Sequence, residues 1–263
     1  MGSEVLAELK GNILRLTLNR PEVRNAFNDK LMKSALEHLN HYKENSDVRV
    51  VVFKGAGSSF CAGADLQWMK DTLHLSYEET VKDSDILAEL FYTLYDYPKP
   101  TVALVNGPAI GGGVGFVAAC DVAIASENAF FRLSEVRLGL IPAVISYFLI
   151  KKVGEGRCRE LMLTGKKFTA SEALDIGLVN KVVKEEELET ALEPYIRHFL
   201  EAGPNALKWC KEVITKASSG SPEEIREFTV DIIAKLRTGP EGQEGMTAFL
   251  QKRTPSWWPK DLK

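Results

Sequence analysis

The sequence predicts an α/β fold with parallel strand pairing. Three observations support this: short β-branched strands end in glycine turns, helical stretches follow those turns, and from about residue 143 the pattern is helical almost throughout. The chain has 263 residues, 45% of them hydrophobic and 26% charged, which is the composition of a globular protein with a substantial core. We expect a core over residues 1–195 and an all-helical region over residues 196–263.

The elements of the core follow one another in a regular order. Two short strands are expected around the Gly11-Asn12 turn, followed by a helix that Asn28 caps. VRVVVFKGAG then predicts a buried strand, residues 76–96 a helix, and TVALVNG a second buried strand. A glycine run that opens a helix comes next, and after it two further strands, DVAIAS and AFFRLS. This alternation is typical of parallel sheets.

Charge and cysteine content exclude several classes of protein. The net charge is −3 and no Lys/Arg-rich run is present, which argues against nucleic-acid binding. Cys61, Cys120, Cys158 and Cys210 lie far apart with no C-x-x-C pair, so we expect no disulfide framework and no metal site. Because neither a leader sequence nor an apolar run of about 20 residues is present, the expected location is the cytoplasm, away from membranes.

Two segments share one design, in which a buried strand runs into a glycine-rich turn and then a helix start. They read VVVFKGAGSSFCAGADLQWM and TVALVNGPAIGGGVGFVAACD. The first N–H groups of a helix lack intrahelical partners, so each turn offers donors to a ligand oxygen. The phosphate motif G-x-G-x-x-G fails at Phe116, and no P-loop lysine follows. We therefore predict an oxyanion hole built from both turns, with close helix-to-strand packing as the alternative.

The segments FCAGADL, NGPAIGGGVGFVAACDVAIAS and FRLSEVRLGLIP resemble the enoyl-CoA hydratase/isomerase (crotonase) family in order and spacing. Supporting matches run from LTLNRPEVRNAFN near the start to EGMTAFLQKRTPSW at the end. The resemblance implies a spiral of ββα units, a C-terminal helical region that builds homotrimers, and hexamers made of two trimers. It also implies stabilisation of the enolate of an acyl-CoA thioester. Coenzyme A then arrives as part of the substrate, and no separate cofactor is expected.

The resemblance assigns three catalytic positions. The N–H groups of Ala64 and Gly112 would hold the thioester oxygen, and Glu135 would handle protons. Gly115 stands where hydratases of the family commonly carry a second glutamate, one helical turn after Gly112. Either Glu135 performs both proton transfers through one water, or the reaction is a double-bond shift from the 3 to the 2 position.

The motif wording looks most like bacterial hydratases of branched, carboxylated acyl-CoAs, namely the 3-methylglutaconyl-CoA hydratases of leucine breakdown and the isohexenylglutaconyl-CoA hydratases. PAVISYFLI replaces the PGxGGTQRL of straight-chain hydratases and marks a different acyl pocket. Tyr147 and Arg132 are candidate partners for a distal substrate carboxylate. The alternatives are a 3,2-enoyl-CoA isomerase, a general short-chain hydratase, and a non-catalytic or RNA-binding member of the family.

The family pattern also implies the residues that contact coenzyme A and the acyl chain. They are Arg24, Ala26, Ala62, Gly63, Asp65, Leu66, Trp68, Gly111, Gly115, Tyr147, Phe249 and Lys252. Several have a structural alternative: a surface ion pair between Arg24 and Glu22, a helix cap for Asp65, and a core position for Trp68.

Overall fold

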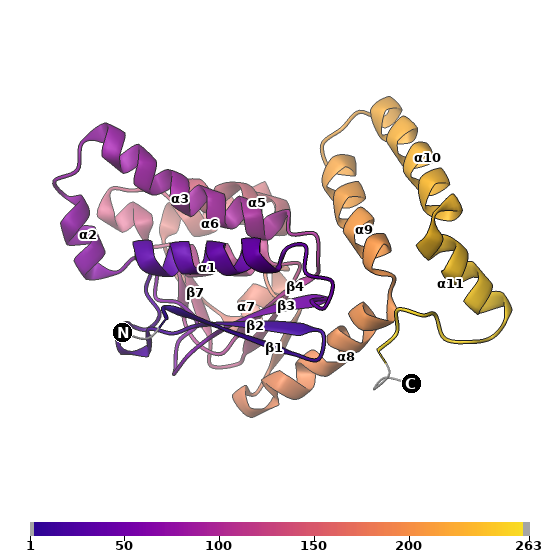
Figure 1. The fold of residues 1–263 in the computed structure, drawn as a ribbon. Helices are drawn as coiled ribbons and strands as arrows, with labels where there is room; N and C mark the ends of the chain where they lie inside the picture. Colours follow the sequence, from indigo (N-terminus) through magenta and orange to yellow (C-terminus); the bar gives the residue numbers. More distant parts are fainter. Residues whose placement is uncertain (1–2, 260–263) are drawn as a thin grey trace.

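The computed structural model describes residues 3–259, which contain two sheets (Figure 1). The larger has the strand order β1-β2-β3-β4-β6-β9, and the smaller β5-β7-β8. β1 pairs with β2 and β7 with β8 antiparallel, whereas the other pairs are parallel, so the predicted α/β class is confirmed. The strands are β1 (Val5–Lys10), β2 (Ile13–Leu18), β3 (Val50–Gly55), β4 (Thr101–Val105), β5 (Ala109–Ile110), β6 (Val122–Ser126), β7 (Phe130–Arg132), β8 (Lys167–Thr169) and β9 (Lys181–Val183).

The helices cover both faces of the larger sheet. They are α1 (Asp29–Tyr42), α2 (Leu66–Thr72), α3 (Tyr77–Tyr95), α4 (Gly112–Ala119), α5 (Ala143–Val153), α6 (Glu155–Thr164), α7 (Ala170–Asp175), α8 (Leu188–Glu201), α9 (Pro204–Ala217), α10 (Pro222–Thr238) and α11 (Pro240–Leu250), with 3₁₀ turns at Pro21–Val23, Glu135–Leu138 and Glu185–Glu187. The predicted cap of α1 is confirmed, since Leu31 N–H donates to Asn28 Oδ1 at 2.9 Å. Within residues 3–259, no helix is both long and apolar enough to cross a membrane.

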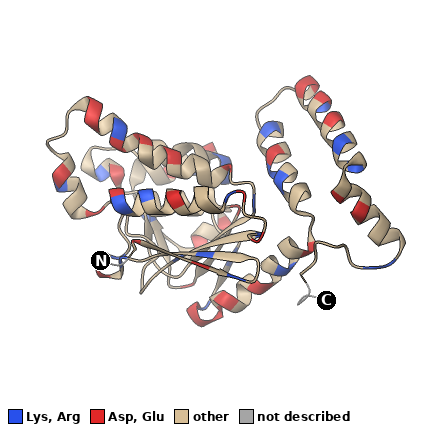
Figure 2. Ribbon diagram, viewed as in Figure 1, with Lys and Arg blue, Asp and Glu red and all other residues tan. Residues whose placement is uncertain are grey.

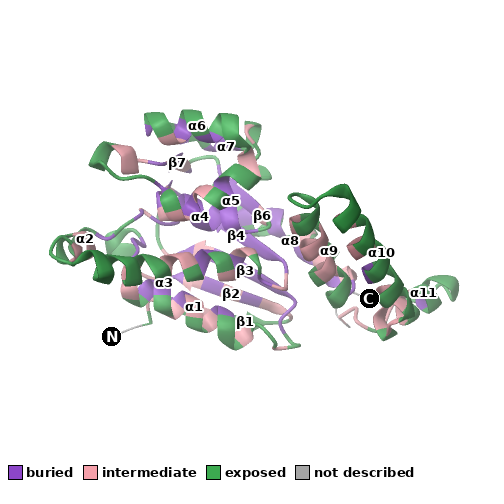
Figure 3. Cartoon of the chain, turned by 90° about the horizontal axis from the view of Figure 1, so that it is seen from above, coloured by how far each residue is buried: buried purple, intermediate pink, exposed green. Residues whose placement is uncertain are grey.

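Alternating side chains of the parallel strands divide the core into two layers. On β3, Val51 and Phe53 face the layer that contains α1, α3 and α4, whereas Val50 and Val52 face α8. α4 is buried along almost its whole length, as its colour in Figure 3 shows. The glycine turn that precedes α4 is therefore held on a rigid element.

Two short strands differ from the sequence-based expectation that the chain is helical almost throughout after residue 143. β8 pairs with β7, and β9 pairs with β6 at one edge of the larger sheet. Each has three residues, too few for an alternating pattern to stand out in the sequence. Their partner strands hold them in place, and these contacts were not predictable from local sequence.

The last three helices form an arm beside the core. α10 packs on α9 and α11, and this group stands apart from α1–α5 in Figures 1 and 3. Acidic and basic residues alternate along the arm, as Figure 2 shows. The boundary expected between residues 195 and 196 stays a prediction; these residues lie inside α8.

A buried arginine anchors the base of this arm. Arg49 is 8% exposed and donates to the carbonyls of Ala202 at 2.6 Å and Trp257 at 3.1 Å. The indole N–H groups of Trp257 and Trp258 both donate to the Glu201 carbonyl. The start and the end of the arm therefore meet at one point of the core.

Candidate active site

The two glycine turns lie side by side. Ile110 N–H donates to the Cys61 carbonyl at 2.9 Å, and Phe60 and Cys61 N–H both donate to the Pro108 carbonyl at 3.1 Å. A side chain at Gly63 would place its Cβ 3.1 Å from the Ile110 carbonyl oxygen, and Gly63 has a φ of 89°. Glycine at this position permits both the backbone conformation and the close approach of the turns.

The N–H group of Ala64 is free for a ligand. Ala64 forms a parallel bridge with Phe27, in which Phe27 N–H donates to the Gly63 carbonyl at 2.7 Å and Asp65 N–H donates to the Phe27 carbonyl at 2.8 Å. In a parallel bridge the flanking residues make the hydrogen bonds, so the N–H of the middle residue points away from the partner. No acceptor among the described residues binds Ala64 N–H, and Ala64 is exposed.

The N–H group of Gly112 is the first of helix α4, where no intrahelical acceptor exists. Gly111 precedes it with φ 52° and ψ −119°, a conformation that strongly favours glycine, and its own N–H donates to the Arg132 carbonyl at 2.9 Å. Across residues 3–259, no acceptor is bound to Gly112 N–H. A Cβ at Gly112 would lie 2.5 Å from Cε2 of Phe27, so glycine also makes room for that ring.

Glu135 places its carboxylate over the second glycine turn. A Cβ built on Gly111 would lie 2.9 Å from Glu135 Oε1 and 3.9 Å from the Cα of Gly63. Glu135 Oε2 is buried and has no hydrogen-bond partner among the described residues. Burial raises the pKa of Glu135 above its ordinary value of 4.5, because desolvation disfavours the charged form. The structure therefore brings one proton-accepting group to both turns.

Gly115 lies against the core, on α4. A Cβ there would lie 2.4 Å from Ile145 Cγ2 and 2.9 Å from Phe91 Cζ, and both of these side chains are buried. The direction that a side chain at position 115 would take is thus filled by α5 and α3. In this chain, a second carboxylate at that position would require Ile145 and Phe91 to move.

Two segments that are expected to contact coenzyme A, around Arg24 and around Ala62, lie next to each other. Ala62 N–H donates to the Arg24 carbonyl at 3.0 Å, and Ala26 directly precedes the bridge residue Phe27. Arg24 is exposed with a φ of 56°, and among the described residues it makes no ion pair with Glu22. The surface ion pair considered as the alternative is thus not formed among these residues, and contact of Arg24 with a phosphate stays a prediction.

Asp65, Leu66 and Trp68 have different environments at the start of α2. Asp65 caps the helix, accepting from Gln67 N–H at 2.7 Å and Trp68 N–H at 3.2 Å. Leu66 is 76% exposed beside Ala64, whereas Trp68 is half-buried and packs against the core. The helix cap expected as the alternative role of Asp65 is thus present, and the contact of Leu66 with a ligand stays a prediction.

The side chains of four expected residues have other environments within one chain. Tyr147 lies in an aromatic cluster, with its ring stacked on Tyr92 at 6.0 Å and edge-on to Tyr95 at 5.8 Å. Phe249 and Lys252 lie at the end of α11, on the arm, and Phe249 is 83% exposed. Arg132 uses its side chain to hold the Gly165 carbonyl at 3.0 Å.

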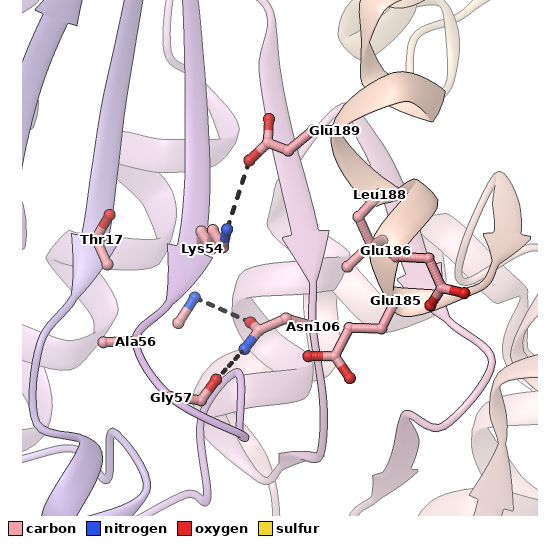
Figure 4. A pocket seen from close by; sticks show the side chains of 10 residues that line it. Thr17, Lys54, Ala56, Gly57, Asn106, Glu185, Glu186, Leu188 and Glu189 are labelled. Atoms are coloured by element: carbon pink, nitrogen blue, oxygen red, sulfur yellow. Dashed lines mark hydrogen bonds and ion pairs between the residues drawn. The ribbon is translucent and has the colours of Figure 1, made fainter.

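A separate cleft of about 680 Å³ opens where β3 and β4 end (Figure 4). Asn106 spans it at the base, accepting from Gly55 N–H and donating to the Gly57 carbonyl. Its rim is lined by three carboxylates, Glu185, Glu186 and Glu189. Lys54 Nζ forms an ion pair with Glu189 Oε1 at 3.5 Å. Such an acidic lining repels the phosphates of coenzyme A, so this cleft is not the candidate site.

Comparison with known proteins identifies the family of the chain. The family model described as Enoyl-CoA hydratase/isomerase matches residues 8–260. A 2,3-dehydroadipyl-CoA hydratase of Escherichia coli is 35% identical over 263 residues, covering 97% of this chain and 98% of the relative. A short-chain-enoyl-CoA hydratase of Clostridium acetobutylicum is 33% identical over 253 residues, covering 95% and 96%. The crystal structure of an enoyl-CoA hydratase from Shewanella pealeana has a TM-score of 0.94 at 35% identity, covering 97% and 96%.

The chain belongs to the enoyl-CoA hydratase/isomerase family, and its fold is the crotonase fold that the resemblance implies. The relatives named above are hydratases, which are hydro-lyases.

Packing at Gly115 gives a prediction about stability. Gly115→Ala should lower the free energy of unfolding by about 1–3 kcal/mol, because the clash with Ile145 outweighs a gain of about 1 kcal/mol in helix propensity. In an Ile145→Ala background the same substitution should cost less stability, because Ile145 no longer meets the added methyl group while Phe91 still does. Urea unfolding of the unaltered protein, the two single variants and the double variant measures the coupling energy between positions 115 and 145.

Gly156→Ala in α6 is the matched control, since a Cβ there meets nothing within 4 Å. It should stabilise the protein in either background. Equal effects of Gly115→Ala with and without Ile145 would contradict the packing described here.

The raised pKa of Glu135 predicts opposite effects on activity and stability. The kcat/KM for thioester turnover should rise with pH through an apparent pKa above 4.5, as Glu135 ionises to become a base. Because the pKa of Glu135 is raised in the folded state, the protein loses stability as the pH rises through that pKa. At pH 7.5, Glu135→Gln should therefore increase the free energy of unfolding while activity falls. A flat rate profile down to pH 4.5 would refute this.

Proposed function

We propose that the chain adds water across the 2,3 double bond of an enoyl-CoA thioester, as a hydro-lyase. The observation that carries this proposal is the buried, unpaired carboxylate of Glu135 over Gly111, beside the free N–H groups of Ala64 and Gly112. Two N–H donors suit an oxygen that gains negative charge, and a carboxylate suits proton transfer.

In the proposed mechanism, the thioester oxygen accepts hydrogen bonds from the N–H groups of Ala64 and Gly112. These bonds withdraw electrons from the double bond and make C3 electrophilic. Glu135 takes one proton from a water as the water oxygen bonds to C3, and the negative charge moves to the thioester oxygen as an enolate. Protonated Glu135 then gives its proton to C2, so one water has been added. Loss of one oxyanion donor typically costs about 10² to 10³ in rate.

For the acyl group, we propose a branched or carboxylated enoyl chain of the 3-methylglutaconyl type. PAVISYFLI in place of PGxGGTQRL supports this choice, and so does the 2,3-dehydroadipyl-CoA hydratase among the relatives, whose named substrate is also a dicarboxylic thioester. The path of coenzyme A from the surface to the turns would be lined by Arg24, Ala26, Ala62, Gly63, Asp65 and Leu66.

A 3,2-enoyl-CoA isomerase is the second candidate, because of the packing at Gly115. With Ile145 and Phe91 filling the direction of a second side chain, Glu135 is the carboxylate that the structure brings to the two turns. Isomerisation needs one base, which removes a proton from C2 and returns it to C4. Hydration through Glu135 requires the same group to act twice.

A panel of thioesters separates these candidates. Loss of absorbance with 3-methylglutaconyl-CoA or 2,3-dehydroadipyl-CoA, faster than with crotonyl-CoA, is expected for a hydratase of carboxylated chains. Glu135→Gln should lower the rate by about 10² to 10⁴. Gain of conjugation from a 3-enoyl-CoA, without hydration of any 2-enoyl thioester, would overturn the hydratase proposal in favour of the isomerase.

Glu186→Gln is the matched control for this panel. Glu186 is an exposed carboxylate on the rim of the acidic cleft. Its substitution should leave turnover unchanged; a loss equal to that of Glu135→Gln would mean that the cleft in Figure 4 takes part in the reaction.

We also propose that the arm assembles the chain into a trimer or a hexamer and carries Phe249 and Lys252 to the coenzyme A of a neighbouring subunit. Exposed apolar residues on the arm support this: Val230 is 57% exposed, Ile233 54% and Phe249 83%. Light scattering should give three or six times the chain mass of 29.2 kDa. Ile233→Glu should lower that mass, and a fully active 29.2 kDa monomer would contradict the proposal.

A further inference from the structure

Arg20 lies beside the bridge that orients Ala64, and its side chain is 13% exposed. All three guanidinium nitrogens have partners: Nε pairs with Glu4 Oε2 at 2.8 Å, Nη1 donates to the Ala26 carbonyl at 2.7 Å, and Nη2 pairs with Asp65 Oδ2 at 2.8 Å. The planar fork of an arginine can satisfy acceptors in several directions at once, which a lysine cannot.

The partners of Arg20 flank the two bridge residues. Ala26 directly precedes Phe27, and Asp65 directly follows Ala64. Two backbone hydrogen bonds, at 2.7 and 2.8 Å, join these segments in the bridge. Arg20 adds two side-chain contacts across the same pair of segments, and Asp65 Oδ1 connects the group to α2 by accepting from Gln67 N–H at 2.7 Å.

We infer that Arg20 is a positioning residue for the oxyanion hole: by joining the Ala26 carbonyl to Asp65, it fixes the direction of the Ala64 N–H. This inference rests on the proposed function of that N–H group. The partners of the Arg20 side chain are Glu4, Ala26 and Asp65, and not the residues that carry the two donor N–H groups. Its substitution should therefore act on the stabilisation of the enolate, which forms during the reaction, more than on binding of the thioester.

The test uses Arg20→Lys, Arg20→Gln and Asp65→Asn. Arg20→Lys keeps the charge but loses the fork that reaches Ala26 and Asp65 at once, whereas Arg20→Gln and Asp65→Asn remove the ion pair. Asp65→Asn keeps an oxygen that can cap α2. We expect kcat per folded enzyme to fall about 10-fold or more, while KM changes by less than about 2-fold. Deleting one oxyanion donor lowers the rate by about 10² to 10³, and a displaced donor should lose part of that rate enhancement. Circular dichroism measures the folded fraction.

A spectroscopic readout separates positioning from a merely structural role. A conjugated dienoyl-CoA that binds to the protein should absorb at longer wavelength when the oxyanion hole polarises its carbonyl. The variants should bind it with a smaller red shift. Arg15→Lys is the matched control, since Arg15 pairs with Glu189 of α8 at 2.9 Å on the half-buried side of β2. It should leave kcat and the red shift unchanged.

The outcomes distinguish this inference from the proposed function. If the unaltered protein shows no turnover and no red shift, the proposed function fails. If it shows both, and folded Arg20→Lys and Asp65→Asn retain its kcat and its full red shift, the inference about Arg20 is overturned while the proposed function stands. A variant that does not fold is replaced in the comparison by the other two.

Discussion

The close approach of two glycine turns is the constraint on which the site depends. The turn after β3 and the turn after β4 share hydrogen bonds from residues 60, 61 and 110, and Gly63 allows the contact because it has no side chain. Their parallel strands bring both turns to the same edge of the sheet. Since the proposed donors are backbone N–H groups, the geometry of the site is the geometry of the fold itself.

Local sequence predicts well what depends on local chemistry. The cap at Asn28, the cap at Asp65, the alternating buried strands and the two turns all follow from residues within a few positions of one another. The contacts that complete the site join residues far apart in the chain: Arg20 with Asp65, and Gly115 with Ile145. No periodic pattern records such pairs, so the residues around Gly115 and the partners of Arg20 could not be predicted.

Glu135 illustrates a compromise between stability and chemistry. A carboxylate with a buried, unpaired oxygen is costly to keep charged, and the same burial makes it a stronger base than an exposed glutamate. Ile145 and Phe91 impose a further restriction, because they fill the space beside Gly115 with apolar groups. Both features leave Glu135 as the carboxylate beside the two turns, which is the basis of its proposed role in proton transfer.

The anchoring of the C-terminal arm has an evolutionary consequence. Arg49 binds carbonyls at residues 202 and 257, so the chain leaves the core and returns to it at nearly the same place. A segment with adjacent ends behaves as an insertion: helices within it can lengthen, shorten or be replaced while the sheet keeps its connections. Lineages with this fold can thus vary the helices of the arm without altering the glycine turns, provided that the arginine and its carbonyl partners persist.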